Sequence, residues 1–351
     1  MQRMVLIFHP GALGDLLLSV PAIQSIRARF PEHRLVLCAQ EEAVRLFVCC
    51  GVVDEGQPFQ GRVCTALFED HGRQEEPFTA WLDRCDLVVA WIRDDEGRLR
   101  ACLERYGVKD SIIRSPFSSD LRAIHQRDRF CETLTDLQAA APTPRQTIVP
   151  AHLRERGAIY LANQGRRRDR SMVLLHPGSG SRHKCVSSTT LGAAAEALRQ
   201  AGVDLRLVEG PADHETIPHV MGQMTEQIPV IRELDLTTLA GVLSCADLFI
   251  GHDSGVTHLA AFVGTPTVAL FGPTEERQWA PAGRHVQVLR GEPCRCSTWS
   301  AVQACTEKPC LNVPTSRIVD VVFAQLGIDV NPRNSSSTAL SPFPPYVRVS
   351  G

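Results

Sequence analysis

The segment from Gly251 to Pro266 combines small and polar residues in a pattern suited to binding an anion. A buried strand is expected to end at Ile250, and Asp253 and Ser254 are residue types that cap a helix beginning near Gly255. The free N–H groups and the dipole of a helix N-terminus favour an anion, and glycine lets it approach the backbone. The segment therefore predicts a phosphate site, with an ordinary capped helix as the alternative.

A second loop, from His176 to Lys184, contains two glycines and two serines. Ser179 and Gly180 would supply hydrogen-bond donors and backbone freedom, and Lys184 would supply a point charge. The order of residues is not that of a Walker A loop. With the Asp253 segment it predicts a diphosphate pocket, because both loops follow strands of one parallel sheet; a solvated turn is the alternative.

Acidic residues follow two other expected strands. Asp15 lies at the mouth of the first sheet, just before a helix, where it could be a general base facing a cleft or simply a helix cap. Spacing alone does not decide between these roles. After the strand ending at Val208, an acid of the group Glu209, Asp213 and Glu215 could bond ribose hydroxyls, or the group could form a polar turn.

Four of the 13 cysteines form a late group: Cys294, Cys296, Cys305 and Cys310. They lack the paired C-x-x-C spacing of a convincing zinc site, so we expect reduced thiols in a long loop, with a closed zinc site as the alternative. The sequence also contains no H-E-x-x-H, G-x-S-x-G or Asp-x-Asp pattern. No metal or other cofactor is expected.

These loops need a scaffold of strands and helices to hold them. Two similar apolar runs, 4–8 and 172–175, each lead into His-Pro-Gly, as strands of a parallel sheet buried on both faces would. Alternating strand and helix patterns predict an α/β fold with right-handed crossovers. Strands are expected at 35–38, 87–90, 205–208, 248–250 and 267–271, helices at 16–29, 191–200, 257–263 and ending at 244, and mainly helix across 92–140.

The length of 351 residues suits two domains. The basic segment 164–170 is the expected linker between domains 1–163 and 171–330, and the Ser/Pro-rich tail 331–351 is expected to be disordered. A net charge of −2 argues against a nucleic-acid binder. No secretory signal or membrane span is recognised, and the odd number of cysteines argues against a secreted disulfide scaffold, so we expect a cytoplasmic protein.

Taken together, the motifs resemble those of glycosyltransferase family 9, the ADP-heptose:lipopolysaccharide heptosyltransferases. The resemblance runs through 11–18, 176–184 and, most specifically, 253–274. It implies a GT-B fold, in which two Rossmann-like domains face each other across a cleft, the N-terminal one binding the acceptor and the C-terminal one the nucleotide-sugar. It also implies an inverting reaction without a catalytic metal.

The resemblance assigns roles to individual residues. Asp15 matches the candidate general base, with Leu13 and Gly14 beside it on the acceptor side. Lys184 matches the lysine near the donor phosphates, in the loop of Ser179 and Gly180. The donor-binding loop is matched by Asp253, Ser254 and Gly255, with His258 one turn further along. Asp213 or Glu215 would match the family's acid near the nucleotide ribose, in poor register.

The expected activity is transfer of a heptose or a related sugar from ADP-heptose to a lipopolysaccharide core acceptor. The alternatives are a sugar-nucleotide epimerase or hydrolase on the same fold, and a catalytically silent nucleotide-sugar binding protein. Cys185 and Val186 stand where many family members have Trp-Pro, and residues 55–150 carry no matching motif, so the sugar and acceptor stay open.

A lipid-linked acceptor would bring the protein to the inner face of the cytoplasmic membrane as a peripheral protein. Arginine-rich stretches could bind an anionic surface there, and solvated helix faces with a linker are the alternative. These stretches contain Arg93, Arg98, Arg100, Arg122, Arg127, Arg129 and Arg166 to Arg168.

Overall fold

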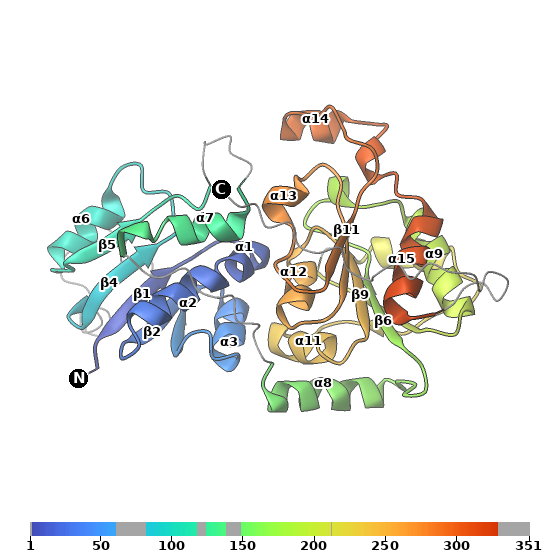
Figure 1. Ribbon diagram of the computed structural model, residues 1–351, viewed down its shortest axis with the longest axis horizontal. Coiled ribbons are helices and arrows are strands. Elements are labelled where there is room, and N and C mark those ends of the chain that lie inside the picture. Colours follow the sequence, from blue (N-terminus) through green and yellow to red (C-terminus); the bar gives the residue numbers. More distant parts are fainter. Residues whose placement is uncertain (1, 61–81, 118–123, 138–148, 212, 329–351) are drawn as a thin grey trace, which may run out of the picture.

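The computed structural model describes residues 2–60, 82–117, 124–137, 149–211 and 213–328. Two twisted sheets lie side by side in it, one built by each half of the chain (Figure 1). Every strand pairing is parallel, as the unbroken apolar runs predicted. The tail 331–351 lies outside the described residues, so its expected disorder stays a prediction.

The first sheet has the strand order β3-β2-β1-β4-β5. Its strands are β1 (Met4–Phe8), β2 (Arg34–Ala39), β3 (Glu55–Pro58), β4 (Cys85–Ala90) and β5 (Asp110–Ile113). The second has the order β11-β10-β9-β6-β7-β8, with β6 (Met172–His176), β7 (Asp204–Val208), β8 (Val230–Ile231), β9 (Leu248–His252), β10 (Thr267–Leu270) and β11 (Val286–Leu289).

Both orders are of the Rossmann type, in which the chain reverses direction across the sheet next to the first strand. The reversal falls between β1 and β4 in the first sheet and between β6 and β9 in the second. Ligands of such sheets bind beyond the carboxyl ends of the strands at this point. The loops after β1, β6 and β9 are therefore the ones placed to build a site.

Helices cover both sheets because each strand has two apolar faces. Along β1, Val5 and Ile7 join one buried cluster while Met4, Leu6 and Phe8 join another on the opposite face. The helices are α1 (Leu13–Leu18), α2 (Val20–Arg29), α3 (Glu41–Cys49), α6 (Arg98–Arg105), α7 (Gln126–Glu132), α8 (Ala151–Asn163), α9 (Ser188–Gln200), α10 (Thr216–Met221), α11 (Leu236–Leu243), α12 (Gly255–Phe262), α13 (Glu276–Trp279), α14 (Trp299–Ala304) and α15 (Thr315–Leu326).

Two expected elements differ from the structure. The helix predicted over 16–29 is two helices, α1 and α2, which meet at Ser19; its Oγ donates to the Leu16 carbonyl at 2.7 Å, and Pro21 supplies no N–H to continue the first helix. The stretch 92–140, expected to be helical, contains the strand β5 between α6 and α7. Only Ile112 and Ile113 of β5 are buried, which is too short an apolar run to be recognised.

The two halves meet along helices. Helix α1 packs on α12, and α3 packs on α11. The ring of Phe47 in α3 also stacks on that of Phe262 at the end of α12, with centroids 6.2 Å apart. Glu42 Oε2 also accepts a hydrogen bond from the Leu236 N–H at 3.0 Å. The carboxyl edges of the two sheets are thereby held against each other.

Helix α8 lies under the second half of the molecule, although the sequence places it before the expected linker (Figure 1). It packs closely on α11 because Gly157 and Gly241 face each other. A Cβ at Gly157 would lie 2.2 Å from the Gly241 carbonyl carbon, and one at Gly241 would lie 2.0 Å from the Leu153 carbonyl oxygen. The boundary at residue 163 stays a prediction, but the buried contacts of α8 are with α11.

Gly157→Ala is expected to destabilise the protein by about 1–3 kcal/mol, because the backbones of α8 and α11 must separate to admit the methyl group. The better helix propensity of alanine, about 1 kcal/mol, offsets only part of this. Urea unfolding followed by circular dichroism measures the change. Glu155→Ala, at an exposed position of the same helix, is the control. An unchanged or raised midpoint for Gly157→Ala would show that the contact is not tight.

Candidate active site

A pocket of about 500 Å³ opens where the carboxyl edges of the two sheets meet. The first half contributes residues from the loop after β1 and the start of α1, and the second half contributes the loops after β6, β9 and β10 together with two tryptophans. Its lining residues are Ala12, Gly14, Asp15, Ser179, Gly180, Lys184, Asp253, Ser254, Gly255, His258, Thr274, Trp279 and Trp299. The structure therefore gathers residues that the sequence separates by up to 287 positions, from Ala12 to Trp299.

Helix α12 begins as the sequence predicted. Ser254 is its N-cap, and the Ser254 Oγ accepts a hydrogen bond from the Thr257 N–H at 3.4 Å. Gly255 faces Leu13 of the first half, and a Cβ there would come within 3.1 Å of the Leu13 Cβ. Leu13 thus packs on the start of α12 and is not itself part of the pocket lining. The N-terminus of α12 opens into the pocket, with the free N–H groups that favour an anion.

Asp253 ties the second-half loops together. Its Oδ2 accepts hydrogen bonds from Lys184 Nζ at 2.7 Å and from Thr274 Oγ1 at 2.8 Å, and Ser179 Oγ donates to its backbone oxygen at 2.6 Å. Burial acts to raise the pKa of Asp253, but His258 and Lys184 outweigh it and lower the pKa to about 2. The carboxylate is therefore ionised at neutral pH and holds the Lys184 ammonium at the pocket.

A neutral histidine connects the loops that follow β6 and β9. His252 is fully buried, its Nε2 accepts from the Val186 N–H at 3.0 Å, and its Nδ1 lies 3.3 Å from the Gly178 carbonyl. Burial lowers the pKa of His252 to about 4, so the ring stays uncharged and Nδ1 carries the proton that bonds Gly178. The β6 and β9 loops are thus joined without placing another charge beside the pocket.

Asp15 is the third residue of α1, whose N-cap is Ala12. The cap alternative for Asp15 is therefore wrong, because a cap precedes the first helical residue. Burial raises the pKa of the Asp15 carboxyl above its ordinary value of 3.8, and the nearby His258 only partly opposes the rise. A carboxylate with a raised pKa at the wall of a pocket is suited to accept a proton.

His258 lies between the two halves. Its side chain is 5% exposed, its Nε2 is 3.9 Å from Asp253 Oδ1, and its ring faces Gly14, where a Cβ would come within 3.1 Å of His258 Cδ2. Its Nδ1 is buried and has no hydrogen-bond partner among the described residues. His258 thus adds a polar side chain to the pocket lining, between Asp15 and Asp253.

The three acids predicted near the ribose do not line this pocket. Asp213 is buried, with its Oδ2 2.8 Å from His176 Nε2 and 2.7 Å from the Gly210 N–H that donates to it. His176 Nδ1 in turn lies 3.4 Å from Ser254 Oγ, so Asp213 reaches the pocket only through His176. Glu209 is paired with His214 at 2.6 Å and with Arg232 at 3.4 Å, and Glu215 immediately precedes α10.

Thr274, Trp279 and Trp299 line the pocket but were not selected from the sequence. Thr274 belongs to the segment 253–274 that carries the family resemblance, so the sequence could have identified it as a candidate site residue. The tryptophans lie in short helices without a recognisable motif, and only their size and polar edge suggest a role in contacting a ring or a sugar face. Trp279 also reaches the first half, with its ring centroid 6.0 Å from that of Phe117.

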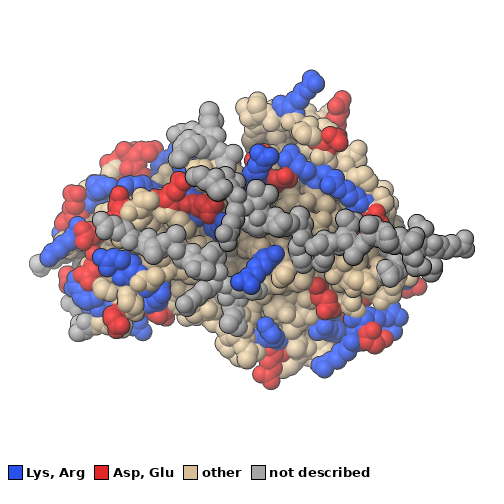
Figure 2. Space-filling view, viewed as in Figure 1, with Lys and Arg blue, Asp and Glu red and all other residues tan. Residues whose placement is uncertain are grey.

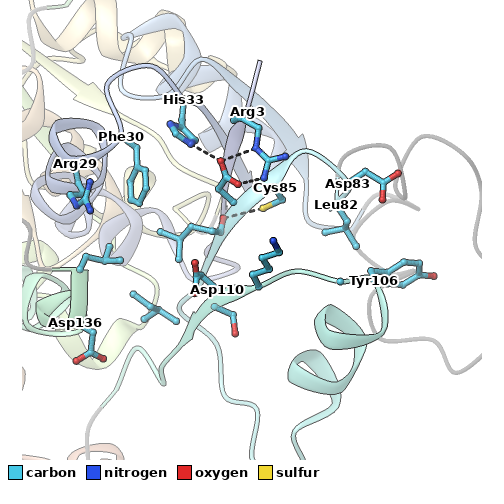
Figure 3. Close-up of a pocket in the computed structure, with 17 residues that line it drawn as sticks. Arg3, Arg29, Phe30, His33, Leu82, Asp83, Cys85, Tyr106, Asp110 and Asp136 are labelled. Carbon is cyan, nitrogen blue, oxygen red and sulfur yellow. Dashed lines mark hydrogen bonds and ion pairs between the residues drawn. The ribbon is translucent and has the colours of Figure 1, made fainter. Parts of the chain in front are cut away.

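A second cavity, of about 1040 Å³, lies at the amino edge of the first sheet (Figure 3). Arg3 and His33, which lie close together in Figure 3, both contact the Asp86 carboxylate. The distances from Arg3 Nε and His33 Nε2 to Asp86 Oδ2 are 2.8 and 2.9 Å. These charges are satisfied by each other. The cavity is also at the opposite end of the strands from Asp15, where Rossmann-type sheets do not usually bind substrates.

Four of the eight described arginines considered for membrane contact are paired with acids. Arg93 pairs with Asp95, Arg98 with Glu96, Arg127 with Asp128 and Arg167 with Asp169. Figure 2 accordingly shows blue and red side chains interspersed over the first half of the molecule. Arg122 lies outside the described residues. No helix in the described part of the chain is long and apolar enough to cross a bilayer.

Comparison with known proteins places the chain in a family. The family model for glycosyltransferase family 9 (heptosyltransferase) matches residues 126–310. A lipopolysaccharide heptosyltransferase 3 from Escherichia coli K12 is 32% identical over 290 residues, which cover 76% of this chain and 82% of that protein. Another Escherichia coli protein of that name is 31% identical over 113 residues, which span 33% of its length and 31% of this chain.

Solved structures agree on the fold. A family 9 glycosyltransferase from Veillonella parvula superposes with a TM-score of 0.77 at 17% identity, covering 94% of this chain and 99% of that one. The Escherichia coli ADP-heptose lipopolysaccharide heptosyltransferase II gives 0.71 at 18% identity, covering 92% and 98%. With two facing Rossmann-like domains and this family match, the chain belongs to glycosyltransferase family 9 and is a glycosyltransferase of the GT-B fold.

Proposed function

We propose that this protein transfers a heptose from ADP-heptose to a lipopolysaccharide core acceptor by an inverting reaction that uses no catalytic metal. One observation carries the proposal: Asp15 from the first half and Lys184 with the α12 N-terminus from the second half line the same pocket. A base on one side and an anion-binding site on the other are what a single displacement at a sugar carbon requires. The relatives named heptosyltransferases support the sugar and acceptor.

In this reaction Asp15 accepts the proton of an acceptor hydroxyl as its oxygen attacks the anomeric carbon. The bond from that carbon to the diphosphate oxygen breaks, and ADP leaves with the electron pair. Attack from the face opposite the leaving group inverts the configuration. The raised pKa of Asp15 suits this role because a stronger base takes the proton more readily.

Charge on the departing diphosphate is stabilised by groups already in place. Lys184 is held by Asp253, and the N–H groups at Gly255 and beyond lie at the start of α12. Preorganised donors of this kind lower the barrier without reorganising during the reaction. Asp15 and Asp253 are the carboxylates among the described residues that line the pocket, and Asp253 is engaged by Lys184 and Thr274. These residues therefore offer no free pair of carboxylates for a divalent ion, which supports the proposal of metal-free chemistry.

The direct test is incubation with ADP-heptose and a heptose-deficient lipopolysaccharide core acceptor, with and without a chelator. We expect ADP release that depends on acceptor, a product linkage of inverted configuration by NMR, and no loss with the chelator. Heptose released without acceptor would instead identify a hydrolase. A product with retained configuration would rule out the single displacement.

The pH dependence follows from Asp15. Its carboxyl must be ionised to accept a proton, and its pKa is raised, so kcat/KM is expected to fall as the pH drops through a value above 3.8. Activity thus increases with pH over this limb and reaches a plateau once Asp15 is deprotonated. Initial rates across the acidic range, at acceptor concentrations well below KM, measure it. A flat profile down to the ordinary carboxyl value would contradict the assignment.

We also propose that the protein works at the cytoplasmic face of the membrane that carries its lipid-linked acceptor. Arg93, Arg98 and Arg127 of the first half are each paired with an acid, which reduces the positive charge they offer an anionic surface. The acceptor itself would therefore supply most of the attachment. Sedimentation with vesicles that contain or lack the core acceptor tests this attachment. Equal binding to anionic vesicles that lack the acceptor would contradict the proposal that the acceptor supplies the attachment.

A further inference from the structure

The strongest feature outside the transferase pocket is a group of four cysteines in the second half. Cys294 and Cys296 lie in the loop between β11 and α14, Cys305 directly follows α14, and Cys310 lies in the short 3-10 helix Pro309–Leu311. Together they span a loop, the end of a helix and a 3-10 turn. Their convergence therefore is a product of the fold and not of regular secondary structure.

The sulfur atoms are close enough to share one ion. Cys294 Sγ lies 3.0 Å from Cys296 Sγ and 4.0 Å from Cys305 Sγ, and the sulfurs of these three residues all lie within 4.8 Å of one another. Cys310 interacts with Cys294 and lines the same small cavity, of about 10 Å³. A zinc ion about 2.3 Å from four thiolates would space them about 3.8 Å apart, which lies between the two measured separations.

A disulfide explains the cluster less well. Both measured separations exceed the sulfur–sulfur bond length of about 2.05 Å, and every cysteine of the cluster is free. The Lys308 N–H also donates to Cys305 Sγ at 3.4 Å, from a backbone held at φ 44°. Backbone N–H groups aimed at sulfur are the usual outer support of a metal-bound thiolate.

The segment also lacks another source of stability. Between Gly291 and Pro309 all residues are described, and Val302 is the only buried one. Figure 1 shows α14 projecting at the upper edge of the second half, away from both sheets. A short excursion with so small an apolar core ordinarily needs a cross-link or a bound ion to hold one conformation.

We propose that the four cysteines bind one divalent metal ion that prefers thiolate ligands, most favourably zinc. The ion would sit in a closed tetrahedral structural site formed by Cys294, Cys296, Cys305 and Cys310. Four protein ligands leave no open position, so the ion takes no part in sugar transfer. This proposal favours the alternative of a closed metal site over the expectation of reduced thiols. The turn at Lys308 and the C-terminus of α14 bring the sulfurs together without C-x-x-C pairs.

The site would stiffen one wall of the transferase pocket. Trp299 begins α14 and lines the pocket, and His183 lines the cysteine cavity while its ring meets that of Trp299 edge-on at 6.4 Å. His183 immediately precedes Lys184. An ion bound by the four thiols would therefore fix the positions of Trp299 and of the Lys184 loop at the wall of the pocket.

Metal analysis of the full chain tests the proposal directly. The protein is purified without chelator and without a metal-charged resin, and zinc and iron are measured by mass spectrometry. We expect about one ion per chain, zinc or iron, held at a four-sulfur site. Cys296→Ser and Cys305→Ser should lower this to about a tenth or less, whereas Cys49→Ser, at an exposed cysteine, should not.

A second measurement covers the case in which a variant does not fold. In the native chain an organomercurial reagent should release the ion in step with modification of four thiols, and trypsin should then cut after Arg295, which is exposed but flanked by two of the ligands. A native chain with no stoichiometric metal, or with metal unaffected in folded Cys296→Ser, would overturn the proposal. None of these readouts depends on sugar transfer.

Discussion

Asp15→Asn is expected to lower kcat for sugar transfer about 10²- to 10⁴-fold, the range associated with loss of a general base. Asparagine has nearly the same shape but cannot accept the proton of the acceptor hydroxyl. Asp15 lies on the first-half wall of the pocket, opposite the Lys184 loop and α12, so the affinity for ADP should change little. Rates measured by ADP release, together with ADP binding by thermal shift, separate the two effects.

Two comparisons make the result specific to Asp15. Asp169→Asn, at an exposed acid of the interdomain segment, should retain full activity and shows the effect of simply removing a negative charge. The acidic limb of the pH profile should also be absent from whatever activity remains in Asp15→Asn. If the variant retained normal kcat, the general base would have to be another group, and His258, which also lines the pocket, would be the next candidate.

Lys184→Met is expected to lower kcat/KM about 10²- to 10³-fold and to weaken ADP binding, because it removes the cation next to the departing diphosphate. The same change leaves Asp253 buried and without its 2.7 Å partner, which destabilises the fold and raises the pKa of that carboxyl. Activity and unfolding midpoint should therefore both fall. Turnover with ADP-sugar and thermal unfolding without ligand measure the two consequences.

The double variant Lys184→Met/Asp253→Asn separates these consequences. Asparagine removes the unpaired buried charge and can still accept the hydrogen bond of Thr274, so much of the stability should return. Sugar transfer should stay low, because no cation has been restored. Recovery of activity with stability would show that Lys184 acts only as a structural partner of Asp253.

Gly178, in the loop after β6, has no room for a side chain. A Cβ there would lie 1.4 Å from Asp213 Oδ1, in the space where Asp213 reaches His176. Asp213 and His176 are both nearly fully buried, so neither can move aside into solvent. The pair positions the Ser254 end of α12 from beneath and needs no contact with the nucleotide to do so.

Local features of this protein could be read from its sequence. The apolar runs of β1 and β6 predict strands that are buried on both faces, as the structure has them. The Ser254 cap and Gly255 place the start of α12 at the expected residue. Such features depend on contacts within about four residues, which spacing reports directly. Asp15 and Lys184 could also be recognised as site candidates, because each follows a strand at the edge where parallel sheets bind ligands.

Only the tertiary structure decided which distant groups become partners. The sequence could not show that Asp213 is turned inward to His176, that Gly157 of α8 meets Gly241 of α11, or that four cysteines in an irregular loop converge. These contacts depend on the order of strands in each sheet and on how two sheets dock. Burial then fixes the chemistry, since a carboxyl group out of water either finds a partner, as Asp253 does, or holds its proton more tightly, as Asp15 does.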